Sequence, residues 1–325
     1  MNRRHAVLAL AAIGAAPLSS FAQQPGKVWR VGFLSSQSAV ELRTRVDALR
    51  AGLRDFGYEE NKTFVIESRL ADGVIDRLPG LAAELVRLNV DVVVTHATNA
   101  IRSAKQANTI IPIVMAAGSD PVALGFVASL ARPGGNITGS TFLPREIQAK
   151  RIELVKEALP GVTQVAVLTD LNSPTREADL AVMQTTAHAL KVTLREFAVR
   201  RPEEIDGAFA AMAKQRIGAV TIFDSPAFLP RAKVLTDLAA KERLPLVGGG
   251  EIADAGGVIG YGASILHLFR RAAYFVDKIF KGAKPGEIPV EQSTTFELII
   301  NLKAAKTFGL RFPQSLLQRA DRVIE

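Results

Sequence analysis

The sequence predicts an α/β fold of two similar lobes, each a mainly parallel sheet with helices on both faces. Short apolar runs, such as residues 91–95, alternate with longer stretches whose apolar residues recur at helical spacing. The predicted strands are apolar throughout rather than at every second position, which is typical of parallel strands buried on both faces. A length of 325 residues is enough for two domains of about 100–200 residues each.

The elements of the first lobe follow from these patterns. Leu42, Val46, Leu49, Leu53 and Phe56 recur at steps of three and four residues, which predicts an amphipathic helix. We expect strands at 28–34, 64–66, 91–95 and 111–115, and helices at 40–56, 78–88 and 99–107.

The same order of elements recurs in the second half. Residues 164–169 resemble 30–34, and residues 244–247 resemble 111–114. We expect strands at 164–169, 192–197, 218–223 and 244–247, and helices at 175–190, 202–215 and 230–242. Residues 31 and 111 are 80 positions apart, as are residues 165 and 245, which predicts two lobes of one repeated architecture.

The remaining segments predict several connections between the lobes, which would act as a hinge. A strong turn signal at 132–136 precedes an extended segment at 137–141, where we expect the chain to cross. We expect a strand at 258–262, a helix at 265–280, an extended segment at 289–295, a strand at 296–301 and two short terminal helices. Residues 28–140 and about 264–290 are assigned to the first lobe, and residues 141–263 and about 291–325 to the second. The three glycines at 248–250 predict a tight turn rather than a phosphate-binding loop.

Residues 1–22 have the three parts of a secretory signal peptide. A short basic start precedes an apolar run at 6–16, and the small residues Ser20 and Ala22 precede an expected cleavage near Ala22/Gln23. The apolar run is about half of the roughly 20 residues that span a bilayer. We therefore expect export and a soluble mature chain. Whether Arg3 and Arg4 mark twin-arginine export or an ordinary signal stays open.

The composition excludes several classes of function. The chain contains no cysteine, which excludes disulfides, cysteine-ligated zinc, iron–sulfur clusters and a lipid-modified cysteine. Lys and Arg outnumber Asp and Glu by 40 to 32, but the basic residues show no aromatic interleaving, so we expect no nucleic-acid binding. No phosphate-loop, dinucleotide-binding or nucleophile-elbow motif occurs, and the four histidines are scattered. We expect no catalytic residues, no metal and no cofactor.

Polar residues follow most of the predicted strands at their carboxyl ends, where open α/β sheets bind ligands. The candidate ligand-binding residues of the first lobe are Ser35, Ser36, Thr95, Ala97, Thr98, Ser119 and Asp120, and two further candidates, Thr141 and Phe142, lie where the chain crosses to the second lobe. Those of the second lobe are Asp170, Asn172, Ser173, Asp224, Ser225, Gly249, Glu251 and Tyr261. Several of these residues, among them Thr98, Asp120 and Ser225, could instead serve only as helix N-caps, so the set carries more weight than any member.

The chemistry of this set predicts a zwitterionic ligand. Free backbone N–H groups and hydroxyls at helix N-termini suit a carboxylate. Asp120, Asp170 and Asp224 suit an ammonium group. Phe142, Phe228 and Tyr261 could stack against an apolar or aromatic side chain. An amino acid carries all of these groups.

A set of stretches spread over nearly the whole mature chain recurs together in one known family. The stretches are 56–58, 61–67, 78–88, 90–95, 111–114, 120–122, 278–285, 296–303 and, most distinctive, ASLARPGGNITG at 128–139. Jointly they resemble the ABC-transporter substrate-binding proteins of the tryptophan or aromatic-amino-acid-like type. The resemblance implies a type I periplasmic binding protein, in which two Rossmann-like lobes joined by three crossing strands trap a ligand. Matched by position, the loops at 95–98, 119–120 and 224–225 and the segment of Tyr261 would contact the ligand.

We therefore expect the periplasmic solute-binding component of an ABC importer. It would capture a small polar or zwitterionic ligand, an amino acid or an amino-acid-like solute that includes aromatic ones, by hinge closure. The expected partners are this ligand and an ABC permease in the inner membrane. We expect a monomer that is free in the periplasm, without a lipid anchor. Two alternatives stay open: a ligand-sensing module for a membrane receptor, and an exported α/β enzyme.

Overall fold

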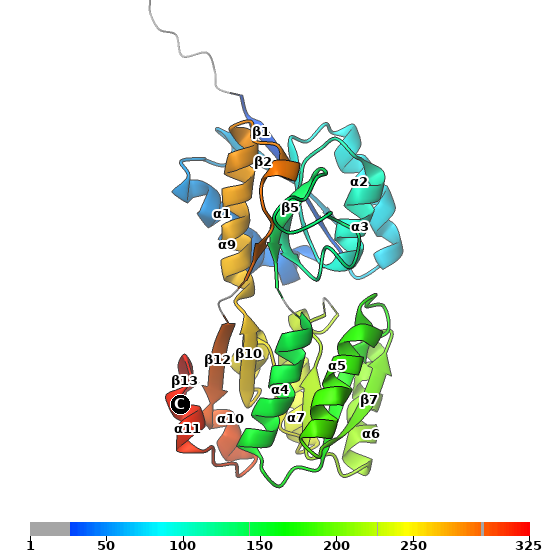
Figure 1. Ribbon diagram of the computed structural model, residues 1–325, viewed down its shortest axis with the longest axis vertical. Coiled ribbons are helices and arrows are strands. Elements are labelled where there is room, and N and C mark those ends of the chain that lie inside the picture. The colour runs from blue at the N-terminus through cyan, green and yellow to red at the C-terminus, as the bar shows by residue number, and fades with distance from the viewer. Residues whose placement is uncertain (1–26, 143, 226, 294–295) are drawn as a thin grey trace, which may run out of the picture.

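The chain folds into two α/β lobes, each built around one sheet (Figure 1). The computed structural model describes residues 27–142, 144–225, 227–293 and 296–325. The predicted signal peptide at 1–22 and its cleavage site lie outside the described residues. Within the described ranges, no helix combines the length and the apolar character that crossing a membrane requires.

The first lobe contains a six-stranded parallel sheet in the order β11-β5-β4-β3-β1-β2. Its strands are β1 (Trp29–Ser35), β2 (Phe64–Leu70), β3 (Val92–His96), β4 (Ile113–Gly118), β5 (Ile137–Thr141) and β11 (Glu291–Gln292). Its helices are α1 (Ala39–Asp55), α2 (Leu78–Arg87), α3 (Thr98–Ala107) and α9 (Ile265–Phe280), with 3-10 turns at Ile75–Arg77 and Pro285–Glu287. Helices α1 and α9 cover one face of the sheet, and α2 and α3 cover the other (Figure 1).

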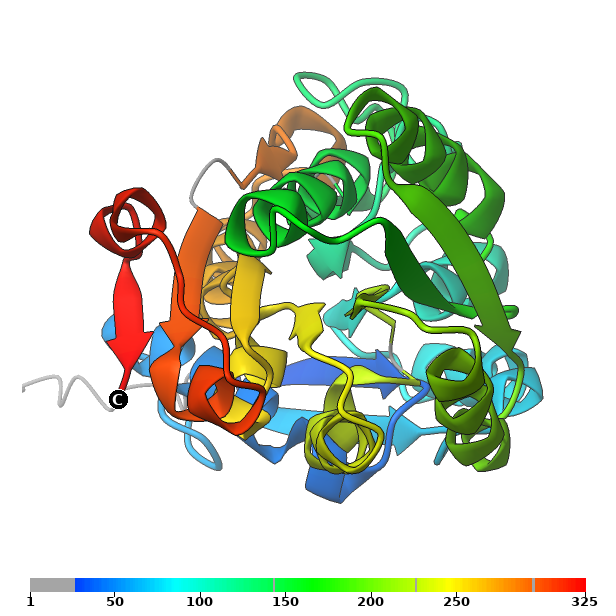
Figure 2. The same cartoon turned by 90° about the horizontal axis from the view of Figure 1, so that it is seen from below.

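The second lobe contains a seven-stranded sheet in the order β13-β12-β10-β9-β8-β6-β7, parallel except for the antiparallel pair β10–β12. Its strands are β6 (Gln164–Asp170), β7 (Thr193–Val199), β8 (Ala219–Ile222), β9 (Leu246–Gly248), β10 (Ile259–Ala263), β12 (Phe296–Asn301) and β13 (Arg322–Ile324). Its helices are α4 (Pro144–Ala158), α5 (Arg176–Ala189), α6 (Ile205–Lys214), α7 (Ala232–Lys241), α8 (Gly250–Ala255), α10 (Leu302–Thr307) and α11 (Gln314–Gln318), with 3-10 turns at Pro202–Glu204 and Leu229–Arg231. Figure 2 shows β13 at one outer edge of this sheet, beside α11.

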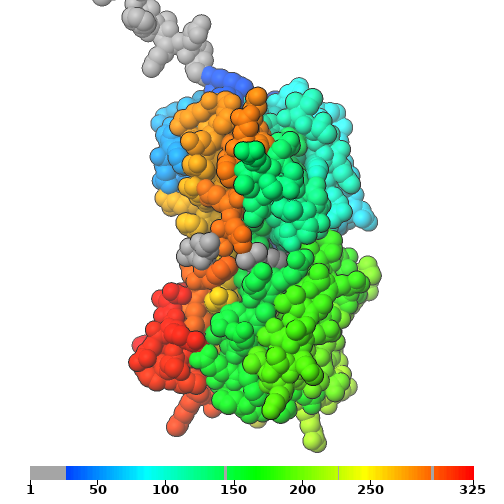
Figure 3. All heavy atoms as spheres, in the orientation of Figure 1, coloured from blue at the N-terminus to red at the C-terminus, as the bar shows by residue number. Residues whose placement is uncertain are grey.

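The predicted repetition is confirmed by the strand orders of the two sheets. The first sheet contains the run β2-β1-β3-β4-β5, and the second contains β7-β6-β8-β9-β10 in the same relative positions. Each run is the doubly wound order in which the sheet extends outward from its first strand in both directions. Figure 3 shows the lobes as two masses stacked end to end.

The chain passes between the lobes three times. The passages lie between β5 and α4, between β10 and α9, and between β11 and β12. Strand β11 at 291–292 pairs with β5 in the first sheet, two residues beyond the boundary expected near 290. Because α9 and β11 return to the first lobe, neither lobe is one continuous segment of chain.

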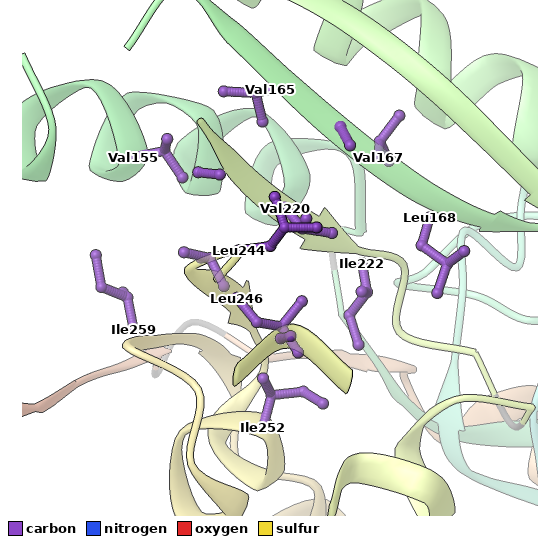
Figure 4. Close-up of a cluster of buried hydrophobic side chains, with 14 of the residues drawn as sticks. Val155, Val165, Val167, Leu168, Val220, Ile222, Leu244, Leu246, Ile252 and Ile259 are labelled. Carbon is purple, nitrogen blue, oxygen red and sulfur yellow. The ribbon is translucent and has the colours of Figure 1, made fainter. Parts of the chain in front are cut away.

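Aliphatic side chains fill the core of the second lobe, as the apolar strand runs predict. In Figure 4, Val165 and Val167 of β6 lie near Val220 of β8, with Ile252 of α8 on the opposite side of the sheet from Val155 of α4. All five are buried. Burial of such side chains contributes about 1.5–3 kcal/mol each, and this holds the helices on both faces of the sheet.

Three elements were not predicted. Helix α4 buries Gln148 and Arg151 along with its aliphatic residues, and these polar positions hide its apolar period. Helix α8 was missed because only one residue, Gly249, forms the expected tight turn between the end of β9 at Gly248 and the start of the helix at Gly250. Glycine is required there because a Cβ on Gly248 would lie 2.6 Å from Cγ1 of Ile252. Strand β13 is only three residues long and largely exposed, so its sequence contains no apolar run that would predict a buried strand.

Replacing each of two helical glycines by alanine should have opposite effects on the stability of the protein. A Cβ on Gly52 of α1 would lie 2.3 Å from the carbonyl oxygen of Arg270 on α9, whereas a Cβ on Gly80 of α2 would contact nothing within 4 Å. We expect Gly52→Ala to lower the free energy of unfolding by about 1–3 kcal/mol through overpacking. Gly80→Ala should raise it by about 0.5–1 kcal/mol, because alanine loses less backbone entropy in a helix. Urea denaturation followed by circular dichroism measures both, and equal effects of the two changes would contradict this contact.

Candidate ligand-binding cleft

The loops that follow the strands of both sheets meet at a pocket between the lobes. Its volume is about 370 Å³, within the range of about 300–1,000 Å³ typical of small-molecule sites. Ten of the predicted site residues line it: Ser36, Ala97, Thr98, Ser119, Phe142, Asp170, Asn172, Ser173, Asp224 and Ser225. The placement of these residues follows from the repeated topology, which turns the carboxyl ends of both sheets toward one another.

Five predicted residues adjoin this pocket without lining it. Gly249 and Glu251 line a separate cavity of about 10 Å³, which also borders Phe142 and Asp224. The other three are buried hydroxyls with partners inside the protein: Ser35 bonds His96, Thr95 donates to the Leu34 carbonyl, and Thr141 donates to the Gly118 carbonyl. Those three side chains join neighbouring strands.

Asp120 and Tyr261 also lie outside the pocket. Asp120 in the first lobe accepts a hydrogen bond from Arg145 of α4 at 3.0 Å, and so joins the two lobes. The ring of Tyr261 packs against Phe296, with 6.0 Å between ring centroids. Phe228, expected at the rim, is fully buried in the core of the second lobe.

The two predicted carboxylates that line the pocket differ in their partners. Asp224 accepts two hydrogen bonds from Nη2 of the buried Arg151, at 2.8 and 2.9 Å. Asp170 accepts from the Ser225 hydroxyl at 2.6 Å and from the Asn172 backbone N–H at 2.8 Å. Among the described residues, no lysine or arginine forms an ion pair with Asp170. Asp170 is therefore the better of the two for binding a cation from solution.

The helix capping expected at Thr98 is absent, because Ala97 is the N-cap of α3 and no side chain caps this helix, whereas Asp120, Asp170 and Ser225 make turn hydrogen bonds. The Asp170 carboxylate accepts from the backbone N–H of Asn172, Ser225 accepts from Ala227, and Asp120 accepts from Ala123. Such bonds shape the loops that enter the cleft. The two roles do not exclude one another, since Asp170 and Ser225 serve their turns and also line the pocket. Contact of these side chains with a ligand stays a prediction.

The first-lobe wall contains a neutral histidine. His96 ends β3, lies 3.0 Å from the Ser35 hydroxyl and packs edge-on against Phe269, with 5.2 Å between centroids. Burial, assisted by the positive charge of Arg45, lowers the pKa of His96 to about 3. The next residue, Ala97, has φ 61° and ψ 144°, a strained conformation for a residue with a Cβ, and it precedes the N-terminus of α3.

Sequence patterns missed the arginines of the pocket. Arg45 of α1, Arg200 after β7 and Arg231 before α7 all line it. Two of them face carboxylates across the cleft: Arg45 lies 3.9 Å from Glu251, and Arg231 lies 3.7 Å from Glu41. In each pair one residue belongs to α1 and the other to the second lobe. The signal that could have revealed Arg45 is its place among the apolar residues of α1, where a charge is unusual.

The polar lining is accompanied by apolar side chains and by no metal site. Phe142, Phe223, Ile265 and Leu229 all line the pocket. Among the described residues, no group of three or more His, Asp or Glu residues is placed to hold a metal ion. The pocket thus combines cationic, anionic and apolar walls, which suits a small molecule that carries both charges.

Comparison with known proteins assigns the chain to a family. Residues 32–324 match the family described as ABC transporter substrate binding protein. The chain belongs to this family. As a substrate-binding protein of this family, it has the type I periplasmic binding fold that its solved relatives share.

Three proteins illustrate what this substrate-binding protein is similar to. A tyrosine-binding protein of Clostridioides difficile is 23% identical over 264 residues, which cover 80% of this chain and 74% of the relative. The structure of an ABC domain from Streptococcus pneumoniae in complex with L-Trp has a TM-score of 0.84 at 24% identity, covering 92% of this chain and 100% of that one. A conserved domain protein from Vibrio cholerae has a TM-score of 0.85 at 25% identity, with coverage of 91% and 100%.

The neutral state of His96 makes the stability of this substrate-binding protein depend on pH. The folded protein has a His96 pKa of about 3, and the unfolded chain one of about 6.5. Between these values the unfolded state binds more protons, so the free energy of unfolding falls as the pH drops below about 6.5. Between pH 6 and pH 4, we expect His96→Asn to reduce the slope of the free energy of unfolding against pH by on the order of 1 kcal/mol per pH unit. Urea denaturation at each pH measures it.

The matched control is His188→Gln, because His188 is exposed on α5. This change should leave the pH dependence as it is in the unmodified protein. If His96→Asn and His188→Gln gave the same slope of stability against pH, a neutral His96 in the folded state would be ruled out.

Proposed function

We propose that this protein is the periplasmic solute-binding component of an ABC importer, and that its ligand is an amino acid with an apolar or aromatic side chain. The observation that carries the proposal is the pocket between the lobes, which places Arg45 on one wall, Asp170 on the other and Phe142 and Phe223 beside them. A zwitterion with an apolar side chain complements all of these groups. The relatives whose names mention tyrosine and L-Trp support the same ligand class.

Binding in this proposal is a shift from an open to a closed arrangement of the lobes. The moving bodies are residues 28–141 with about 264–292, and residues 144–263 with about 293–325. The three chain passages form the hinge. A ligand that contacts both lobes binds the closed form more tightly than the open one, and no chemical step is required.

The setting of the protein is part of the same proposal. Residues 1–22 direct export and are removed near Ala22/Gln23, and the mature chain is a monomer free in the periplasm. It delivers its ligand to an ABC permease in the inner membrane and binds no nucleic acid. The absence of cysteine from the sequence supports a protein without a lipid anchor.

A thermal-shift panel tests the ligand class. We expect L-tyrosine, L-tryptophan or L-leucine to raise the melting temperature, because a ligand at 100 times its Kd stabilises the folded state by about 2.7 kcal/mol. Glucose and myo-inositol serve as control solutes that lack both charges, and they should give no shift. A shift with the sugars and none with any amino acid would refute this ligand class.

Asp170→Asn tests the site of the ligand's ammonium group. We expect it to weaken L-tyrosine binding by about 1.5–3 kcal/mol, the contribution of a hydrogen bond to a charged group. The variant should bind 3-(4-hydroxyphenyl)propionate, which lacks the amine, nearly as well as the unmodified protein does. Isothermal titration calorimetry measures both affinities.

Asp120→Asn is the matched control, because its carboxylate pairs with Arg145 across the lobes outside the pocket. Any loss caused by this change should be the same for both ligands. An equal loss for both ligands in Asp170→Asn would show that Asp170 does not bind the amine.

A further inference from the structure

Arg45 is a cation on the buried face of a helix. The buried residues of α1 are Leu42, Arg45, Leu49, Gly52 and Leu53, and Arg45 is 6% exposed. A charge in such a position is costly unless partners replace the water that it has lost. The identity of those partners therefore bears on what Arg45 does.

The partners of Arg45 within the protein leave much of its guanidinium available. Nη1 donates a hydrogen bond of 2.6 Å to Oε1 of Gln37. Nη2 lies 3.9 Å from the Glu251 carboxylate, too far for a hydrogen bond. A guanidinium has five N–H donors, and Arg45 lines the pocket. By contrast, the buried Arg151, which borders only the separate cavity of about 10 Å³, makes two bonds of 2.8 and 2.9 Å to Asp224.

The charges around Arg45 do not compensate for its burial. Burial lowers the pKa of the Arg45 guanidinium, and the attraction of Glu251 and Glu41 only partly opposes this. Burial also raises the pKa of the Glu251 carboxyl, and at 3.9 Å this carboxylate makes no hydrogen bond to Arg45. A carboxylate brought in by a ligand would supply what the protein does not.

The other two arginines of the pocket are less suited to this role. The side chain of Arg231 is 33% exposed and donates to the Ala227 carbonyl, and Arg200 is exposed. Hydrogen bonds between charged groups are stronger where the surroundings exclude water. Among these three arginines, Arg45 therefore offers the strongest site for a carboxylate.

We propose that Arg45 binds the carboxylate of the ligand and is the residue that selects amino acids over amines of the same shape. The inference rests on the proposed function and adds the arrangement of the ligand: carboxylate on α1 of the first lobe, ammonium on Asp170 of the second. A ligand held in this way connects the two lobes through its own charges. An amine without a carboxylate would leave the buried Arg45 without its partner.

Two ligand pairs test this role by isothermal titration calorimetry: L-tyrosine with tyramine, and L-tryptophan with tryptamine. In the unmodified protein we expect the amino acid to bind about 10- to 100-fold more tightly than the amine, the ratio expected for a charged hydrogen-bond pair. Arg45→Gln should reduce this ratio to less than about threefold, mainly by weakening the amino acid. Arg45→Lys, which keeps the charge but not the planar group, should give an intermediate ratio and serves if Arg45→Gln does not fold.

Arg322→Gln is the matched control, because Arg322 pairs with Asp254 on the surface and lies outside the pocket. It should keep the full preference for the amino acid. If Arg45→Gln kept that preference, or if the unmodified protein bound acid and amine equally, the role of Arg45 would be refuted while the ligand class stood. If the unmodified protein bound none of the four compounds, the proposed ligand class would be refuted and the role of Arg45 with it.

Discussion

Arg151 is a charged side chain with no exposed surface, and the cleft face of the second lobe depends on its hydrogen bonds. Its guanidinium donates to the Asp224 carboxylate and to the backbone carbonyls of Ile222 and Tyr261. One side chain of α4 thus ties together the cleft ends of β8 and β10. Removing one member of such a buried pair typically costs about 3–5 kcal/mol, because the remaining charge has no partner.

The anchored strand ends determine what the cleft can recognise. Asp224 is committed to Arg151 and is not free to bind a cation from solution, which leaves Asp170 as the anionic group of the second-lobe wall. The facing wall presents Arg45 from α1. Opposite charges on opposite lobes mean that a small zwitterion can satisfy both walls only when the lobes are together. In the proposed function, recognition and closure are then one event.

Much of the fold could be predicted from the sequence, because each buried parallel strand is a continuous apolar run. Such a run can be recognised without knowing which strands lie beside it. The strand-end loops could be predicted with them, since the topology of an open sheet determines where they meet. The pairing partners of individual charged residues could not be predicted. Asp120 and Asp170 both follow an apolar strand, yet only Asp120 meets an arginine, Arg145, from the other lobe.

Arg45 is a further charged residue whose position in the structure the sequence did not predict. The apolar period of α1 indicated Val46 as a buried position, whereas Arg45 is buried and Val46 only half-buried. The groups that explain this, Gln37 and the distant Glu251, are brought to Arg45 by the fold. Helix α4 was missed for a related reason, because its buried Arg151 pairs with a residue 73 positions away.

The return of α9 and β11 to the first lobe has a consequence for how the chain reaches this structure. The Tyr58 hydroxyl donates to Asp277, 219 positions further along the chain, and β5 remains the sheet edge until residues 291–292 pair with it. The first lobe begins to form early in synthesis but cannot be completed until α9 and β11 emerge. Contacts between such distant residues slow folding, because a long loop must close before they form. The connections between the lobes therefore delay completion of the first lobe until nearly the whole chain has emerged, and the second lobe, which needs β12 and β13, is completed after it.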